Sequence, residues 1–143
     1  MTETRPAPGR EDVLAQLQAE QEKSGYVSEP FMAQLAEAAG LSLSEVYAVA
    51  TFYHFLSTEP QGRWVIRVCQ SLPCYLKSSR LVVEAIGAKL GIAPGETTPD
   101  GKFSLQTTNC IGACDQAPAM LLNHDLHGHL TPETIGRLLD ACP

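Results

Sequence analysis

The chain has 143 residues, of which 44% are hydrophobic, and its formal net charge is −6. This length and composition suit one domain, or one domain with a small appendage, and exclude a disordered chain. The charge is uneven, because residues 1–60 hold three basic and nine acidic side chains whereas residues 61–143 hold seven of each. An acidic amino-terminal half argues against binding to nucleic acid or to an anionic membrane.

The sequence also predicts a cytoplasmic protein. No apolar run approaches the ~18 residues that a membrane span needs. The first residues lack an apolar signal core, and Glu3, Glu11 and Asp12 argue against a transit peptide. Any association with the cytoplasmic face of a membrane would run through partner subunits.

Helical periodicity predicts three helices within residues 1–60. Gly25 ends the first helix and Gly40 ends the second. Ser42 and Glu45 form a capping box for the third. Further signals are the start of the pattern at Glu11, the cap Ser28, Pro30 in the following turn, and Val46, Val49, Phe52 and Tyr53 on the apolar side of the third helix.

Residues 61–143 follow a turn-rich joint at Glu59-Pro60-Gln61-Gly62 and are expected to form a small α/β domain in the order β-α-β-β-α. In the first helix of this domain the apolar side is expected to include Leu81, Val82 and Ile86. The expected elements are a strand at 64–68, a helix at 78–90, strands at 102–107 and 119–122, a turn at 123–128, and a final helix capped by Thr131 with Pro132 at its first position.

Four of the five cysteines form two pairs, Cys69-x4-Cys74 and Cys110-x3-Cys114, and each pair follows a predicted strand. Strand-end loops at one edge of a sheet can bring four thiolates to one point, and a metal or cluster explains why they gather. The spacing alone leaves four alternatives open. They are an iron–sulfur cluster, a structural zinc ion, disulfides and ordinary buried cysteines.

The composition of the two cysteine loops favours the cluster. Ser71, Pro73, Gly112 and Ala113 are small or compact, so backbone N–H groups can approach bridging sulfides. Neither loop contains lysine or arginine, and Asp115 adds a negative charge beside Cys114. These features predict a low reduction potential.

Three stretches around the cysteines, residues 68–76, 95–105 and 110–118, resemble the thioredoxin-like [2Fe–2S] ferredoxins. These include the 24-kDa-type subunits of NADH:quinone oxidoreductase. Upstream, residues 25–27 and 45–53 are similar to the helical region of the same family. The resemblance covers roughly residues 12–140 and implies an amino-terminal helical bundle at 1–60 followed by a thioredoxin-like [2Fe–2S] domain at 61–143.

The resemblance implies that Cys69, Cys74, Cys110 and Cys114 bind the iron of one [2Fe–2S] cluster. Cys142 matches no motif position and is interpreted as incidental. The family often has glycine where Ser78 stands, at the entry to a helix, and we expect this serine to cap the helix.

The resemblance further implies an electron-transfer subunit that exchanges single electrons with the FMN of a partner flavoprotein. FMN and NAD(H) are expected on that partner, because Gly87 and Gly91 do not form a G-x-G-x-x-G fingerprint. Further iron–sulfur subunits would complete a multisubunit complex, and the chain would not be active alone. A respiratory NADH:quinone oxidoreductase is the first hypothesis. The alternatives are an NAD-linked or electron-bifurcating hydrogenase, a formate dehydrogenase, and a free-standing redox carrier or sensor.

Two other features have simpler interpretations. His124, His127 and His129 fall in a predicted turn, where a solvated or locally hydrogen-bonded role is expected rather than a second metal site. Residues 31–55 could pass for a helix-turn-helix, but they contain no arginine or lysine to contact phosphate. The simpler interpretation is a small helical packing layer. We also expect residues 11–58 to dock the flavoprotein, and the alternative is that Phe52, Tyr53 and Phe55 pack the two halves of the chain together.

Overall fold

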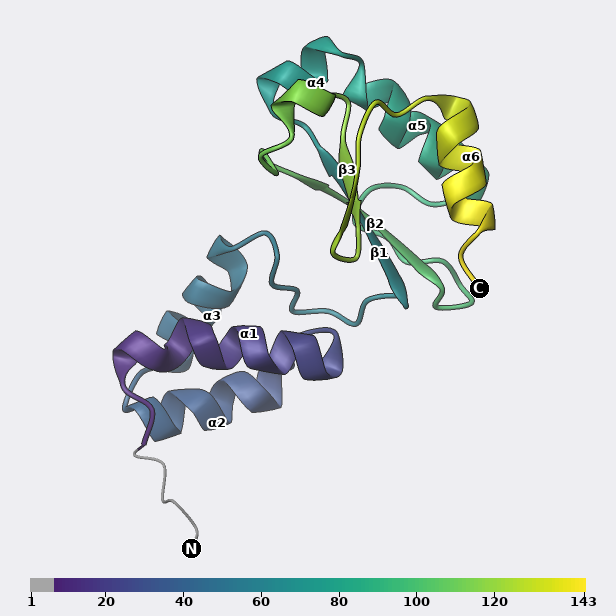
Figure 1. Ribbon diagram of the computed structural model, residues 1–143. Coiled ribbons are helices and arrows are strands. Elements are labelled where there is room, and N and C mark those ends of the chain that lie inside the picture. Colours follow the sequence, from purple (N-terminus) through teal and green to yellow (C-terminus); the bar gives the residue numbers. More distant parts are fainter. Residues whose placement is uncertain (1–6) are drawn as a thin grey trace, which may run out of the picture. The chain divides into compact units, whose positions relative to one another are not determined.

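The computed structural model describes residues 7–143, and its backbone contacts divide the chain into two compact units, Met1–Pro60 and Gln61–Pro143. Figure 1 shows helices in the first unit and a sheet with helices in the second. Within the described residues, no helix has both the length and the apolar character to cross a membrane. The mixed helix and sheet architecture with a helical amino-terminal part agrees with the fold class predicted from the sequence.

The first unit, hereafter the helical unit, contains a short 3-10 turn, η1 (Arg10–Asp12), and the helices α1 (Val13–Ser24), α2 (Glu29–Ala39) and α3 (Leu43–Phe52). The three α-helices contact one another around a small core. Leu17, Val27, Val46 and Ala50 are fully buried there. Burial of such side chains stabilises a unit of this size, at about 0.8 kcal/mol for each buried CH₂ group.

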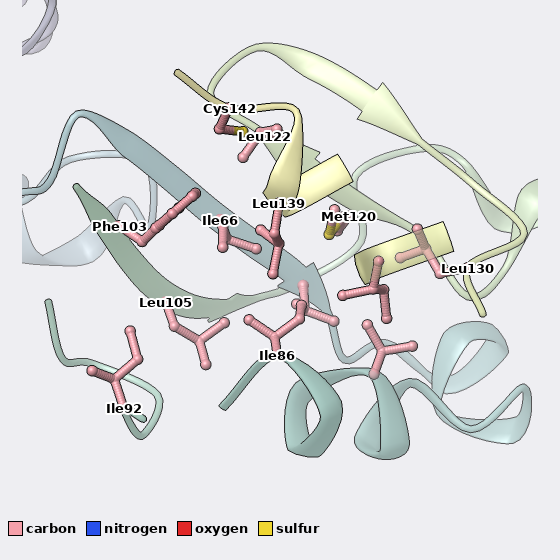
Figure 2. Close-up of a cluster of buried hydrophobic side chains, with 13 residues drawn as sticks. Ile66, Ile86, Ile92, Phe103, Leu105, Met120, Leu122, Leu130, Leu139 and Cys142 are labelled. Carbon is pink, nitrogen blue, oxygen red and sulfur yellow. The ribbon is translucent and has the colours of Figure 1, made fainter. Parts of the chain in front are cut away.

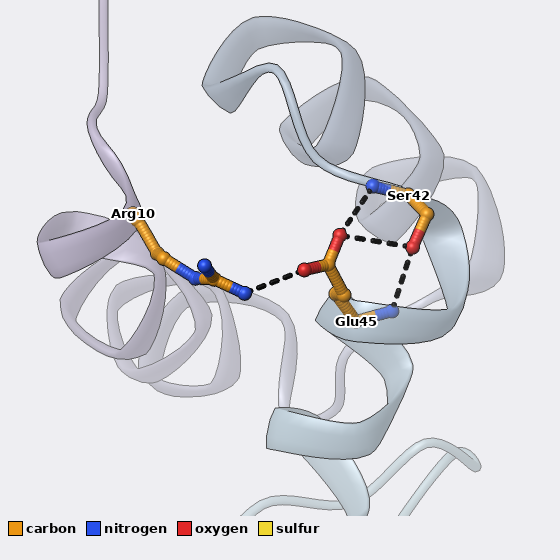
Figure 3. Close-up of polar contacts among 3 residues, drawn as sticks. All are labelled: Arg10, Ser42 and Glu45. Carbon is orange, nitrogen blue, oxygen red and sulfur yellow. Dashed lines mark hydrogen bonds and ion pairs between the residues drawn. The ribbon is translucent and has the colours of Figure 1, made fainter.

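The ends of these helices follow the signals in the sequence. Gly25 and Gly40 adopt left-handed conformations, with φ of 81° and 66°, which glycine accepts without steric cost. The Phe31 backbone N–H donates to Ser28 Oγ at 3.3 Å. The capping box of Ser42 and Glu45 is formed, and Figure 3 shows the Arg10 guanidinium paired with the same Glu45 carboxylate.

The second unit, hereafter the cluster unit, contains a four-stranded sheet in the order β2-β1-β3-β4. Strands β1 (Trp64–Cys69) and β2 (Phe103–Thr108) are parallel neighbours in this sheet. Strand β3 (Met120–Leu122) runs antiparallel to β1 and forms a hairpin with β4 (Asp125–His127). The crossover between the two parallel strands contains α4 (Leu72–Leu76) and α5 (Ser79–Leu90), and α6 (Pro132–Asp140) ends the chain after the hairpin.

The main core of the cluster unit lies between the sheet and the helices α5 and α6 (Figures 1 and 2). Alternate residues of the strands enter it, as the two-residue period of a strand requires. The Thr131 hydroxyl accepts the Thr134 N–H and so caps α6 as expected. The fully or nearly fully buried residues of this core are Ile66, Val68, Val82, Ile86, Ile92, Phe103, Leu105, Met120, Leu122, Leu130, Ile135, Leu139 and Cys142.

The structure corrects the predicted β-α-β-β-α order. It adds α4 between β1 and α5, and it forms β4 inside the segment predicted as a turn. Four side chains also differ from expectation. Ser78 adopts a left-handed conformation, with φ of 65°, and makes no side-chain cap. Leu81, Phe52 and Tyr53 were expected on apolar helix faces, but all three are exposed.

Candidate metal centre

The sheet topology brings the two cysteine pairs to one edge. Because β1 and β2 are parallel, their carboxyl ends lie side by side, and Cys69 at the end of β1 pairs in register with Thr108 at the end of β2. Cys110 follows two residues later, and Cys114 opens the 3-10 turn η2 (Cys114–Gln116). Cys74 lies in α4, directly after β1. The predicted gathering of the cysteines behind two strand ends is therefore what the backbone produces.

Cys110 and Cys114 form the exposed pair of this centre. Their sulfurs are 3.4 Å apart, and the Gly112 backbone N–H donates to Cys110 Sγ at 3.4 Å. The separation exceeds the ~2.05 Å of a disulfide bond, and all five cysteines of the chain are free thiols. Gly112 has φ of 79°, a conformation that allows the short loop between the two cysteines to turn.

Cys69 and Cys74 form the buried pair, with exposed fractions of 1% and 2%. They pack with Ala113 and Ala119 in a small apolar cluster, against which Ile111 and Ala117 also lie. One pair therefore belongs to the protein interior and the other faces solvent. A group held by all four sulfurs would be shielded on one side and accessible on the other.

The thiols of the two pairs influence one another. Burial raises the pKa of Cys69, but hydrogen bonds from the Ser71 backbone N–H and from the Cys74 thiol more than offset this, so its net pKa lies below the usual value. Burial raises the pKa of Cys74, and the neighbouring Cys69 sulfur raises it further. The pKa of Cys114 is raised by its hydrogen bond to the Cys110 thiol, then by desolvation, and also by the charge of Cys69. The four sulfurs thus lie close enough to interact electrostatically.

The chemistry of this donor set fits an iron–sulfur cluster. Backbone N–H groups of Ser71 and Ile111 point to the Cys69 sulfur, and that of Gly112 points to Cys110. N–H donors of this kind stabilise the negative charge of a cluster with four thiolate ligands. Neither cysteine loop has a lysine or arginine that would do so instead.

The cysteines are arranged as two pairs rather than as one compact group. In the part of the chain that the structure describes, no three His, Cys, Asp or Glu side chains are grouped to hold a single metal ion. A [2Fe–2S] cluster has two irons and shares four ligands between them. The four sulfurs of the two pairs are as many ligands as such a cluster takes. Among these same residues, His124, His127 and His129 form no three-ligand group either, and His127 lies in β4.

Two features of the centre carry no clear sequence signal. The helix α4, which positions Cys74, spans only five residues and is too short for a periodic pattern. The side-chain nitrogen of Gln70, beside Cys69, is buried without a hydrogen-bond partner among the described residues. Cys142 lies outside this centre, in the main core, where its thiol donates to the Leu138 carbonyl oxygen at 3.3 Å.

Comparison with known sequences agrees with this geometry. The sequence model of the thioredoxin-like [2Fe–2S] ferredoxins matches residues 2–143. Because this match spans nearly the whole chain, the protein belongs to that family. Family membership supports an iron–sulfur cluster over the zinc, disulfide and core-cysteine alternatives.

Two curated relatives are subunits of NADH-quinone oxidoreductases. The subunit from Pseudomonas aeruginosa is 40% identical over 121 residues, which are 85% of this chain and 73% of that protein. The corresponding protein of Escherichia coli strain K12 is 42% identical over 120 residues, which are 84% of this chain and 72% of that protein.

Among solved structures, the chain is similar to a chain of the NAD⁺-reducing [NiFe]-hydrogenase in its air-oxidized state. The TM-score is 0.73 at 29% identity, and the match covers 98% of this chain and 24% of the hydrogenase chain. This protein therefore spans about a quarter of the hydrogenase chain that it resembles.

Proposed function

We propose that Cys69, Cys74, Cys110 and Cys114 bind one [2Fe–2S] cluster, and that the chain is an electron-transfer component of a multisubunit NADH-oxidising complex. The observation that carries this proposal is the meeting of a buried and an exposed thiol pair at the carboxyl ends of two parallel strands. A bound [2Fe–2S] cluster supplies reversible one-electron chemistry.

The residues of the chain have separate tasks in this proposal. Cys69 and Cys74 hold the centre in the apolar interior, which limits the access of water. Cys110 and Cys114 bring its other side to the surface, where a redox partner can approach. The N–H donors of Ser71, Ile111 and Gly112 stabilise negative charge on the sulfurs.

The proposed electron partner is a flavoprotein subunit that carries FMN and binds NAD(H). The sequence of this chain has no glycine-rich dinucleotide fingerprint, so hydride transfer from NADH is assigned to that partner. A flavin passes on its electrons one at a time, which a one-electron centre can accept. Further iron–sulfur subunits would complete the complex, at the cytoplasmic face of the membrane in the respiratory case.

The respiratory NADH-quinone oxidoreductase is the proposed host, because the relatives from that enzyme are 40% and 42% identical over most of this chain. An NAD⁺-reducing hydrogenase is the second candidate, and the structural similarity over 98% of the chain favours it. The genes that lie beside this one distinguish the two hosts, since only a hydrogenase requires a [NiFe] subunit.

The test is anaerobic purification of the native protein from cell extract. We expect a red-brown complex with about two irons and two acid-labile sulfides for each copy of this chain. The complex should oxidise NADH, whereas the isolated chain should not, although a strong chemical reductant should give it a paramagnetic signal. Zinc without labile sulfide would refute the cluster, and NADH oxidation by chain free of flavoprotein would refute the assignment to a larger complex.

A further inference from the structure

Gln70 is the residue after the first cysteine, and its main chain joins the two cysteine-bearing segments. Its backbone N–H donates to the Thr108 carbonyl oxygen at 2.9 Å, and the Cys69 N–H donates to the Ala119 carbonyl oxygen at 3.2 Å. Thr108 ends β2, two residues before Cys110. Gln70 is therefore fixed at the edge of the sheet where the four cysteines meet.

The side chain of Gln70 carries a buried donor without an acceptor. Its amide nitrogen Nε2 is buried and has no hydrogen-bond partner within residues 7–143, although the residue as a whole is half-buried. Glutamine usually keeps its amide in water, and buried amide donors nearly always find an acceptor. The described residues thus supply no hydrogen-bond acceptor for this amide nitrogen.

The cysteine centre is the neighbouring group that needs donors. Backbone N–H groups of Ser71 and Ile111 already donate to the Cys69 sulfur, and Gln70 lies between Cys69 and Ser71 in the chain. Resting on the proposed function, we infer that the Gln70 carboxamide donates one N–H to the iron–sulfur centre, at the Cys69 thiolate or at a sulfide, and raises the reduction potential of that centre.

The sign of the effect follows from charge. Reduction adds one negative charge to a centre that is already anionic, so a hydrogen-bond donor stabilises the reduced form more than the oxidised form. Loss of the donor therefore lowers the reduction potential. Asp115, which is exposed beside Cys114, acts in the opposite direction because its negative charge opposes reduction.

The experiment measures the reduction potential of the complete protein with its cluster, by a redox titration followed by electron paramagnetic resonance. Gln70→Met keeps the length of the side chain and removes the donor. At a fixed applied potential we expect its ratio of reduced to oxidised centre to fall about tenfold, which corresponds to about 59 mV for one electron. Gln70→Asn keeps a donor on a shorter side chain, so its reduction potential should lie between those of the unchanged protein and Gln70→Met.

Gln106→Met is the matched control. Gln106 lies on β2 of the same sheet, and its amide Nε2 already donates to Gln61 Oε1 at 2.7 Å. Its replacement should leave the reduction potential unchanged, whatever it does to stability. A Gln70→Met protein with a full cluster and an unchanged potential would overturn the inference.

A second measurement does not depend on any variant folding. Protein whose glutamine side chains carry ¹⁵N should show, in pulsed paramagnetic resonance of the reduced form, a coupling to one side-chain nitrogen. Absence of that coupling would overturn the inference even if Gln70→Met lost its cluster. Native protein without any iron or labile sulfide would instead refute the proposed function, so the two failures are distinguishable.

Discussion

The helical unit and the cluster unit differ in what they expose and in the chemistry they hold. All five cysteines lie in the cluster unit, whereas the whole excess of negative charge lies in residues 1–60. The helical unit holds none of the proposed ligands, and its mainly aliphatic core packs its three helices together. The proposed redox centre therefore lies entirely in the cluster unit.

Both units nevertheless expose large apolar side chains. In the helical unit Phe52 and Phe55 are 73% and 48% exposed, and Phe52 borders a groove of about 370 Å³ between the start of α1 and the end of α3. In the cluster unit Leu72 and Leu76 of α4 are 67% and 71% exposed beside the buried Cys74. Exposed apolar patches often mark interaction sites. Recognition is therefore a question of which patch supplies the affinity.

The removal of single thiols is the strongest test of the assignment of the redox centre to the cluster unit. Replacing Cys69, Cys74, Cys110 or Cys114 with serine should reduce the bound iron and labile sulfide to below about a tenth, because a thiolate ligand is lost. The absorbance of the purified proteins in the visible range and their iron content measure this directly.

Cys142→Ser is the control for that series. Cys142 lies in the main core, and its thiol donates to a helix carbonyl oxygen. Its replacement should cost some stability through the loss of packing but keep the visible spectrum. A Cys142→Ser protein that bleaches as fully as the other four would contradict the ligand assignment.

Removal of the helical unit should have the next largest effect. A chain that begins at Gln61 should keep its cluster spectrum, because all four proposed ligands and the whole sheet lie beyond that point. It should bind the flavoprotein at least about 30-fold more weakly, the loss expected when hot-spot anchors are removed. A quantitative pull-down with purified flavoprotein measures the affinity.

Side-chain variants of the full chain sharpen the same test. Phe52→Ser should weaken binding more than Leu76→Ser if the helical unit supplies the affinity, and the reverse order would assign it to α4. Leu126→Ser, at an exposed position of β4, is the matched control.

The chain that begins at Gln61 has two outcomes that contradict a docking role for the helical unit. If this chain unfolds and loses its cluster, the helices are structural. If it binds the flavoprotein at full strength, the docking surface lies in the cluster unit.

Local chemistry made much of both units predictable. Four helix ends could be predicted because each depends on one residue and its near neighbours in the chain. Gly25 and Gly40 end helices through a left-handed backbone, and Ser42 and Thr131 begin helices through a hydroxyl that accepts a backbone N–H. The strand that ends at Cys69 was equally clear from its β-branched run. The two cysteine pairs could be assigned to one edge because parallel strands place their ends together.

The errors have a common cause in tertiary structure. β4 is three residues long and forms only because β3 lies beside it, and α4 is held in the crossover between two strands. Periodicity showed that Phe52 and Leu81 share faces with apolar neighbours, but it does not say how far a neighbouring element covers each face. The left-handed backbone of Ser78 explains why glycine suits that position, a requirement that a serine in the sequence does not reveal.

The smallest expected effect concerns the capping box, which belongs to the helical unit alone. The Ser42 backbone N–H, then the Ser42 hydroxyl and the Arg10 guanidinium, lower the pKa of Glu45 from its ordinary value. A carboxylate with a lowered pKa stabilises the folded state above its unfolded pKa, and this contribution is lost as pH falls through the folded value.

Glu45→Gln should therefore destabilise the helical unit at pH 7 and have little effect at about pH 3. Urea unfolding followed by circular dichroism at both pH values measures this, with Glu22→Gln on the exposed surface of α1 as the matched control. An equal loss at both pH values would show that the charge of Glu45 contributes nothing, and that its packing and hydrogen-bond geometry alone support α3.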